Sequence, residues 1–202
     1  MKTLQNEKVV HMNREGLLIS ERIHEVTWIC SREHPIYEQI SNYSIALYVI
    51  GYLRSPDLMS CDDIGQSEAS NILEEYFTEI PEERLPLEYD ITCAEDKYLV
   101  VFGEKAFPVH FAVLADTESA SPYFSKLDFL GCGFDSMEEL KNDYLKKDGV
   151  HGEIHFFKMN KASSVQDSCR GKIYILKNDG SYSVFEEDNN QKNARRVNRV
   201  NY

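Results

Sequence analysis

The stretch that decides the fold is Pro108-Val-His-Phe-Ala-Val-Leu-Ala-Asp116, and it is followed by Pro122-Tyr-Phe-Ser-Lys-Leu-Asp128. Both segments predict β-strands, and in the first one His110 and Phe111 point to opposite faces because successive side chains alternate along a strand. A histidine at the start of an apolar strand is held by rigid neighbours and has an ordinary pKa near neutrality, which suits a general base. An ordinary buried histidine fits the same position.

Downstream of Pro86 the spacing of apolar residues is that of extended chain. Strands are expected at 87–93, 97–102, 109–115, 123–129 and 152–159, and the first four predict an antiparallel meander. The capping box Ser136-Met-Glu-Glu139 predicts a helix over 136–147. A final hairpin is expected from strands at 172–177 and 181–187, joined by turn residues.

Upstream of Pro86 the pattern is mainly helical. Residues 17–30 fit either a short helix or a strand, whereas 69–80 predict an amphipathic helix that ends at a proline. Apolar residues at three- and four-residue steps predict a helix over 35–53, but Ser41-Asn42, both good N-cap residues, are an alternative start inside it. Helices first and strands afterwards predict an α+β fold, with N-terminal helices packed on a mainly antiparallel sheet.

Length and composition predict one domain with two polar ends. The chain has 202 residues, of which 42% are hydrophobic and 28% are charged, as in an ordinary globular protein with one well-packed core. We expect a flexible arm over 1–16, a single α+β domain over 17–188 and a basic disordered tail over 189–202.

The net charge of -12 and the pI near 5.0 restrict the partners. Nucleic-acid binding depends on Lys and Arg side chains that neutralise phosphates, so we expect no nucleic-acid partner. No apolar run approaches the roughly 18 residues of a membrane helix, and the first residues lack the apolar core of a secretory signal. We therefore expect a soluble protein without membrane contact, located in the cytoplasm or delivered into a host cytosol.

Cysteine and histidine spacings indicate neither a disulfide framework nor a metal module. The five cysteines are widely spaced and odd in number, so mostly reduced thiols are expected. His151-Gly-Glu153-Ile-His155 could place a histidine, a carboxylate and a second histidine on one strand face, where they could ligate zinc. The wet face of a half-buried sheet shows the same pattern, and no fourth ligand accompanies it, so we expect no metal and no cofactor.

Three short motifs around His110 occur in the same order as in a known family. Glu95-Asp-Lys-Tyr-Leu-Val-Val-Phe102 looks like an acidic turn and strand, and His110-Phe-Ala-Val113 looks like a strand that begins with histidine. Ser125-Lys-Leu127 matches the first three positions of a Ser-Lys-Leu-Gly motif, with Asp128 in place of the glycine. Over residues 40–160 this order resembles the papain-like cysteine hydrolases of NlpC type, in which a cysteine opens a helix packed on the sheet.

The resemblance places the nucleophile near the start of the helix predicted around Ser41-Asn42. Aligning an Asn-Cys-x-x-x-Ala-Leu type segment on Ala46-Leu47 puts Asn42 at the cysteine, and sliding by two residues puts Ser44 there. Neither residue is a thiol, so Cys30, upstream, is the alternative nucleophile. The structural interpretations are an N-cap for Asn42 and a small packed residue for Ser44.

The resemblance implies a hydrolase or transferase acting on an amide bond, with His110 as the base. Asp116, Ser125 and Asp128 are candidates to orient the imidazole, and we expect Ser125 on the neighbouring strand, because Asp116 lies six residues from His110 along one strand. Lys126 and Asp96 are expected to contact a protein or peptide substrate. Because the aligned position lacks a thiol, the chain would be a natural inactive relative or a copy inactivated by substitution. The alternative is a non-catalytic protein-binding or inhibitory module that uses its acidic surface against a basic partner.

Overall fold

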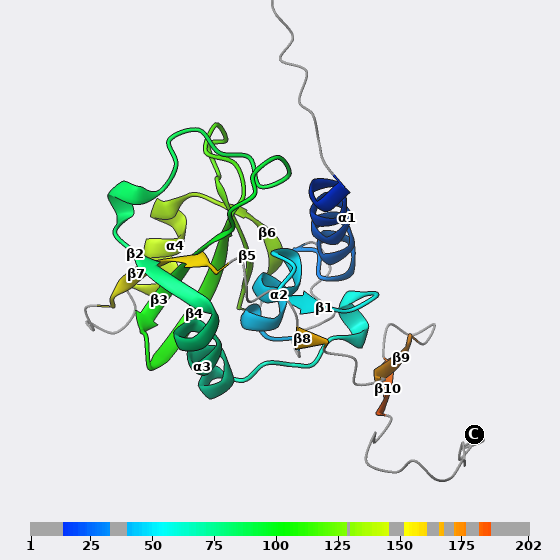
Figure 1. Ribbon diagram of the computed structural model, residues 1–202. Coiled ribbons are helices and arrows are strands. Elements are labelled where there is room, and N and C mark those ends of the chain that lie inside the picture. The colour runs from blue at the N-terminus through cyan, green and yellow to red at the C-terminus, as the bar shows by residue number, and fades with distance from the viewer. Residues whose placement is uncertain are drawn as a thin grey trace, which may run out of the picture.

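The computed structural model describes residues 14–32, 40–128, 130–145, 152–160, 166–167, 172–176 and 182–186. Within these residues the helices are α1 (Arg14–Ile29), α2 (Asn42–Val49), α3 (Gln66–Tyr76) and α4 (Met137–Tyr144), with two short 3-10 turns, η1 (Leu58–Ser60) and η2 (Glu82–Arg84). They surround a central sheet (Figure 1), which confirms the predicted α+β fold. Of these helices, none is both long and apolar enough to cross a membrane.

The central sheet has the strand order β2-β7-β3-β4-β5-β6, and every neighbouring pair in it is antiparallel. Its strands are β2 (Phe77–Ile80), β3 (Tyr98–Glu104), β4 (Phe107–Leu114), β5 (Tyr123–Leu127), β6 (Gly131–Asp135) and β7 (Ile154–Met159). β3, β4 and β5 confirm three of the four strands of the predicted meander, and β6 continues it where no strand was expected. β7 returns across the sheet to lie between β2 and β3, a long-range pairing that no local pattern indicates.

Two smaller strand pairs lie outside the central sheet. β1 (Leu53–Arg54) pairs in parallel with β8 (Gln166–Asp167), and β9 (Lys172–Leu176) pairs antiparallel with β10 (Tyr182–Glu186). The second pair confirms the predicted hairpin.

The two faces of the sheet are covered by different helices. Tyr43 of α2 packs edge-on against Phe111 of β4, with 4.9 Å between the ring centroids. Tyr144 of α4 stacks on His110, the preceding residue of the same strand, at 4.0 Å. Because neighbouring residues of a strand point to opposite faces, α2 and α4 cover opposite sides of β4.

Several helix boundaries differ from the sequence prediction. α1 begins at Arg14, inside the segment expected to be a flexible arm, and residues 17–29 are helical rather than extended, with Cys30 in the turn that follows. Ser41 is the N-cap of α2 and its hydroxyl accepts a hydrogen bond from the Ser44 N–H, which confirms the alternative helix start. Residues 33–39 lie outside the described residues. The capping box at Ser136 is confirmed, and α4 ends at Tyr144.

One predicted element is confirmed but too long, and another is wrong. The helix expected over 69–80 ends at Tyr76, because the next four residues form β2 and pair with β7. The strand expected over 87–93 is replaced by turns, since the Asp90 carboxylate accepts hydrogen bonds from the N–H and the hydroxyl of Thr92. A local side-chain hydrogen bond of this kind offers the backbone an alternative to a strand ladder. The tail over 189–202 lies outside the described residues.

Candidate functional site

Asn42, the first nucleophile candidate, connects α2 to β4. Its side-chain oxygen accepts a hydrogen bond from the N–H of Phe111 at 3.0 Å, and its amide donates to the carbonyl oxygen of Val109 at 3.4 Å. The ladder between β4 and β5 begins only at Ala112, so Asn42 supplies the partners that β5 does not. A buried backbone donor needs such a partner, which makes Asn42 a structural residue.

Ser44, the second candidate, is fully buried, and its hydroxyl belongs to a polar network. It accepts a hydrogen bond from the Ile64 N–H at 2.7 Å. Its hydroxyl also lies 3.1 Å from Asp63 Oδ1, 3.3 Å from the Asp62 carbonyl oxygen and 2.9 Å from Ser41 Oγ. These contacts hold the loop before α3 against the start of α2.

The N-terminal end of α2 also holds a carboxylate of the protein itself. Asp63 Oδ1 accepts hydrogen bonds from the Ser41 N–H at 2.9 Å and from the Ser44 hydroxyl. A helix N-terminus favours a negative charge, and in a papain-like site this end would stabilise the oxyanion. Here the carboxylate of Asp63 lies against that end.

His110 lies on the other side of the sheet from α2. Its ring stacks on Tyr144 with 14° between the planes, and its side chain is fully buried. Neither ring nitrogen has a hydrogen-bonding partner among the described residues. Burial lowers the pKa of His110 to about 3, so the imidazole is neutral at physiological pH.

The structure therefore does not bring His110 together with Asn42 or Ser44. A general base must lie within hydrogen-bonding reach of the proton that it removes, and here the sheet separates the ring from both candidates. Asn42 contacts the backbone on either side of His110, but the imidazole points to the opposite face.

The other predicted site residues lie in three separate places. Ser125 shares the face of His110 and donates to Asp135 Oδ2 at 3.3 Å. Lys126 points to the opposite face, and its ammonium group donates to the carbonyl oxygen of Ile40. Asp96 accepts a hydrogen bond from Lys158 at 2.6 Å. Lys126 and Asp96, the two residues expected to contact a substrate, therefore do not meet in one site.

The predicted histidine-carboxylate face has a structural role in the described part of the chain. His155 lies between two carboxylates, with Nδ1 2.8 Å from Glu79 Oε1 and Nε2 2.9 Å from Glu153 Oε2. His151 lies outside the described residues. Among the described residues, no group of three or more His, Cys, Asp or Glu side chains could hold a metal ion.

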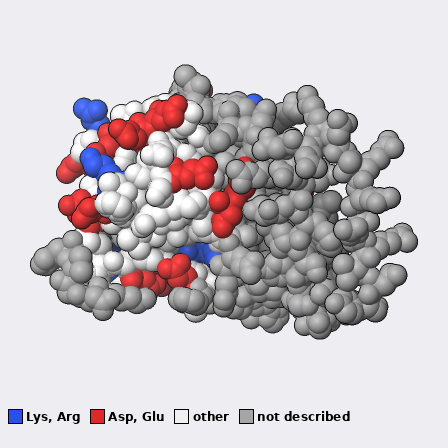
Figure 2. Space-filling view, turned by 90° about the horizontal axis from the view of Figure 1, so that it is seen from below, with Lys and Arg blue, Asp and Glu red and all other residues white. Residues whose placement is uncertain are grey.

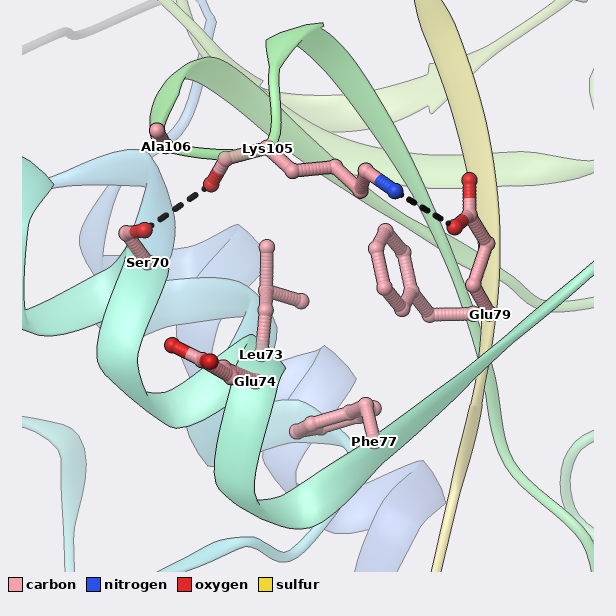
Figure 3. A pocket seen from close by; sticks show the side chains of 8 residues that line it. Ser70, Leu73, Glu74, Phe77, Glu79, Lys105 and Ala106 are labelled. Atoms are coloured by element: carbon pink, nitrogen blue, oxygen red, sulfur yellow. Dashed lines mark hydrogen bonds and ion pairs between the residues drawn. The ribbon is translucent and has the colours of Figure 1, made fainter.

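A pocket that the sequence did not indicate lies between α3, the turn from β3 to β4, and the edge of the sheet (Figure 3). Its volume is about 390 Å³. It is lined by Ser70, Leu73, Glu74, Phe77, Glu79, Lys105, Ala106 and Phe157. The pocket exists because α3 ends at Tyr76, so that Phe77 enters β2 and forms an apolar wall with Leu73 and Phe157.

The polar groups of this pocket lie at its rim. Lys105 Nζ is 2.8 Å from Glu79 Oε2, and the Ser70 hydroxyl donates to the Lys105 carbonyl oxygen at 2.9 Å. The hydrogen bond from Lys105 holds the pKa of Glu79 below its usual value. Glu74 is an exposed carboxylate on α3, beside the pocket in Figure 3.

The surface around the pocket is acidic. Between residues 66 and 84 the exposed acidic side chains are Glu68, Glu74, Glu75, Glu79, Glu82 and Glu83, whereas Arg84 is the only Lys or Arg in that segment. Seen from below, the side on which α3 lies in Figure 1, acidic side chains are spread over the described surface with few basic ones among them (Figure 2). The acidic residues of this segment are visible in the sequence, but the pocket beside them is not.

Comparisons with family models, with curated proteins and with solved structures find no match to this chain.

Proposed function

We propose that this protein is a non-catalytic binding module that takes up an apolar side chain flanked by basic residues, presented by a protein or peptide partner. The observation that carries the proposal is the pocket beside α3, where an apolar wall lies beneath carboxylates at the rim. Binding sites generally combine an apolar lining with a few polar groups that orient the ligand.

The volume and walls of the pocket favour an apolar anchor. A cavity of about 390 Å³ is at the small end of the range for ligand sites and accommodates one large side chain and its backbone. Leu73, Phe77 and Phe157 supply the apolar contacts, so an aliphatic or aromatic anchor would lose its exposure to water there.

The rim charges favour basic residues next to the anchor. Lys105 is paired with Glu79, whereas Glu74 adds a further carboxylate to the rim. A Lys or Arg of the partner would meet Glu74, and the net charge of -12 would steer a basic partner toward the molecule.

The arrangement at α2 supports a binding role over amide hydrolysis. Hydrolysis of the papain-like type needs a nucleophile and a base in contact. Asn42 and Ser44 form hydrogen bonds that hold the scaffold together, and the buried ring of His110 faces α4.

Fluorescence anisotropy with two labelled synthetic peptides tests the proposal. One peptide carries a single Phe between Lys and Arg residues, and the other carries the same Phe between Glu residues. We expect saturable binding of the basic peptide that weakens with salt, and at least about tenfold weaker binding of the acidic one. Equal affinity for both peptides, or no binding of either, contradicts the proposal.

Three variants locate the binding site. Glu74→Lys reverses a rim charge and should weaken binding of the basic peptide by about tenfold or more. Glu75→Lys is the matched control, because Glu75 is exposed on the same helix but does not line the pocket. Ala106→Trp adds bulk to an exposed residue of the lining and should abolish binding of the apolar anchor. An equal effect of the two glutamate variants would mean that charge alone, without the pocket, attracts the peptide.

A further inference from the structure

Two cysteines that lie 102 positions apart in the sequence, Cys30 and Cys132, meet at the edge of the sheet. Cys30 follows the last residue of α1, and Cys132 lies on β6. The Cys132 N–H donates to the Cys30 carbonyl oxygen at 2.7 Å, and the next residue, Ser31, forms a parallel bridge with Cys132. Both cysteine side chains are buried.

The backbone holds the two cysteines together closely. Gly131 has a φ of +81°, and a Cβ atom at that residue would lie 2.5 Å from the carbonyl oxygen of Cys30. Only glycine allows this approach and this backbone conformation. The backbone hydrogen bond between the two residues keeps them side by side, and a disulfide requires Cα atoms roughly 4.4–6.8 Å apart.

A buried cation lies beside the thiol pair. Lys126 is directly opposite Cys132 in the ladder between β5 and β6, so their side chains share one face. The neighbouring Cys132 thiol and the positive charge of Lys126 lower the pKa of Cys30, against the effect of its own burial. Burial raises the pKa of Cys132. Of the two thiols, Cys30 is thus the one whose ionisation the surroundings favour.

The other two cysteines of the described residues differ from this pair. Cys61 is buried, its pKa is raised to about 12 by burial, and its thiol faces the Asp57 carbonyl oxygen at 3.7 Å. Cys93 is exposed beside Asp90. Neither of them is joined to another cysteine by a backbone hydrogen bond or bridge among the described residues.

We propose that Cys30 and Cys132 form a dithiol site that reacts with a small hydroperoxide and closes to an intramolecular disulfide. The Cys30 sulfur attacks one peroxide oxygen, so that an S–O bond forms and the O–O bond breaks, and the remaining oxygen takes up a proton and leaves as an alcohol, or as water when the oxidant is hydrogen peroxide. The Cys132 sulfur then attacks the Cys30 sulfur. The S–S bond forms, and the S–O bond breaks with loss of water that carries the Cys132 proton. The thiol pair loses two electrons, and the peroxide gains them.

The burial of both sulfurs selects the oxidant by size. Cys30 is 1% exposed and Cys132 is 2% exposed. A hydroperoxide of a few atoms reaches such sulfurs through small fluctuations, whereas exchange with the disulfide of another protein requires a larger opening. The site is independent of the pocket beside α3.

Mass spectrometry of the full chain tests the proposal. The reduced protein is treated with hydrogen peroxide, unfolded in the presence of N-ethylmaleimide, digested and mapped. We expect a peptide linked through Cys30 and Cys132 that dithiothreitol cleaves, formed at least about tenfold faster than any modification of Cys61. Oxidation of Cys93 alone, or a disulfide between other cysteines, would overturn the proposal. This measurement needs no substitution, so it does not depend on whether a variant folds.

Variants separate the roles of the two sulfurs. In Cys132→Ser the Cys30 sulfenic acid has no partner and should be trapped by dimedone, whereas Cys30→Ser should give no dimedone adduct at Cys132. Cys61→Ser is the matched control and should form the disulfide at the wild-type rate. Lys126→Met should slow the reaction by about tenfold, and Lys126→Arg should restore part of the rate. Equal dimedone labelling of Cys30 and Cys132 in the two single variants contradicts the assignment of Cys30 as the nucleophile.

Discussion

α2 and α3 pack on the same face of β4, but their surroundings differ. The polar side chains at the start of α2 are buried in hydrogen bonds, and we call this the closed region; α3 borders a pocket, and we call this the open region. Every residue of α2 is buried, and the side chains of Asn42 and Ser44 bond to backbone groups of β4 and of the loop before α3. α3 buries only Ala69, Ile72 and Leu73, and a pocket lies beside it. Polar residues at a helix start are therefore a poor sign of catalytic chemistry when the surrounding backbone groups need hydrogen-bonding partners.

The largest effect should come from Asn42 in the closed region. Asn42→Ala leaves the buried N–H of Phe111 without its acceptor, which should lower the free energy of unfolding by about 2–3 kcal/mol. Urea unfolding measures this change. The matched control is Asn71→Ala, because Asn71 is exposed on α3, and a surface change of this kind alters stability by less than about 0.5 kcal/mol. Equal effects of both substitutions would remove the distinction between the two helices.

The next effect concerns the pH dependence of stability at His110. The folded pKa of about 3 is below the unfolded value of 6.5, so below about pH 6.5 the unfolded state binds a proton that the folded state excludes. The free energy of unfolding should therefore fall by up to about 1.4 kcal/mol for each pH unit below that value, and the contribution should be constant above about pH 7.

His110→Leu should remove this contribution. Urea unfolding at several pH values between about 5 and 7 should show a shallower decline for the variant than for the wild type. His24→Gln is the control, because His24 is exposed on α1, and it should leave the slope unchanged. A wild-type slope that His110→Leu does not alter would mean that the ring is protonated in the folded protein.

A smaller effect is expected at Ser44. Ser44→Ala removes the acceptor of the buried Ile64 N–H and should lower the free energy of unfolding by about 1–2 kcal/mol. Ser67→Ala on the exposed side of α3 is the matched substitution and should cost less than about 0.5 kcal/mol. Ser44→Cys tests the catalytic interpretation as well. Iodoacetamide should alkylate the new thiol slowly. The rate should be the same in Ser44→Cys and in the double variant that also carries His110→Leu.

The smallest effect on stability is expected in the open region. Lys105→Ala breaks an exposed ion pair with Glu79, and such pairs contribute little to folding. The midpoint of urea unfolding should therefore not change measurably, although the shape of the pocket rim does. A clear loss of stability in Lys105→Ala would show that the pocket is part of the structural core rather than an open site.

The elements predicted correctly are those whose signals are local. The capping box at Ser136 places the start of α4, the turn residues after β9 predict the hairpin, and alternating apolar residues predict β3, β4 and β5. The alternation of side chains along β4 also places His110 and Phe111 on opposite faces of the sheet. Each of these signals depends on residues within one helical turn or one strand, which is why a single sequence contains it.

The tertiary structure decided which face each helix covers, and with it the fate of the candidate site. The order of motifs around His110 indicated a base beside the start of α2, but α4 packs on its ring and α2 packs on the opposite face. The pocket and the pair Cys30–Cys132 likewise join segments that are distant in the chain. The sequence determined the local elements and the acidic charge, because these depend on neighbouring residues and composition. Only the tertiary structure decided which side chains meet, because long-range packing is set by the whole core.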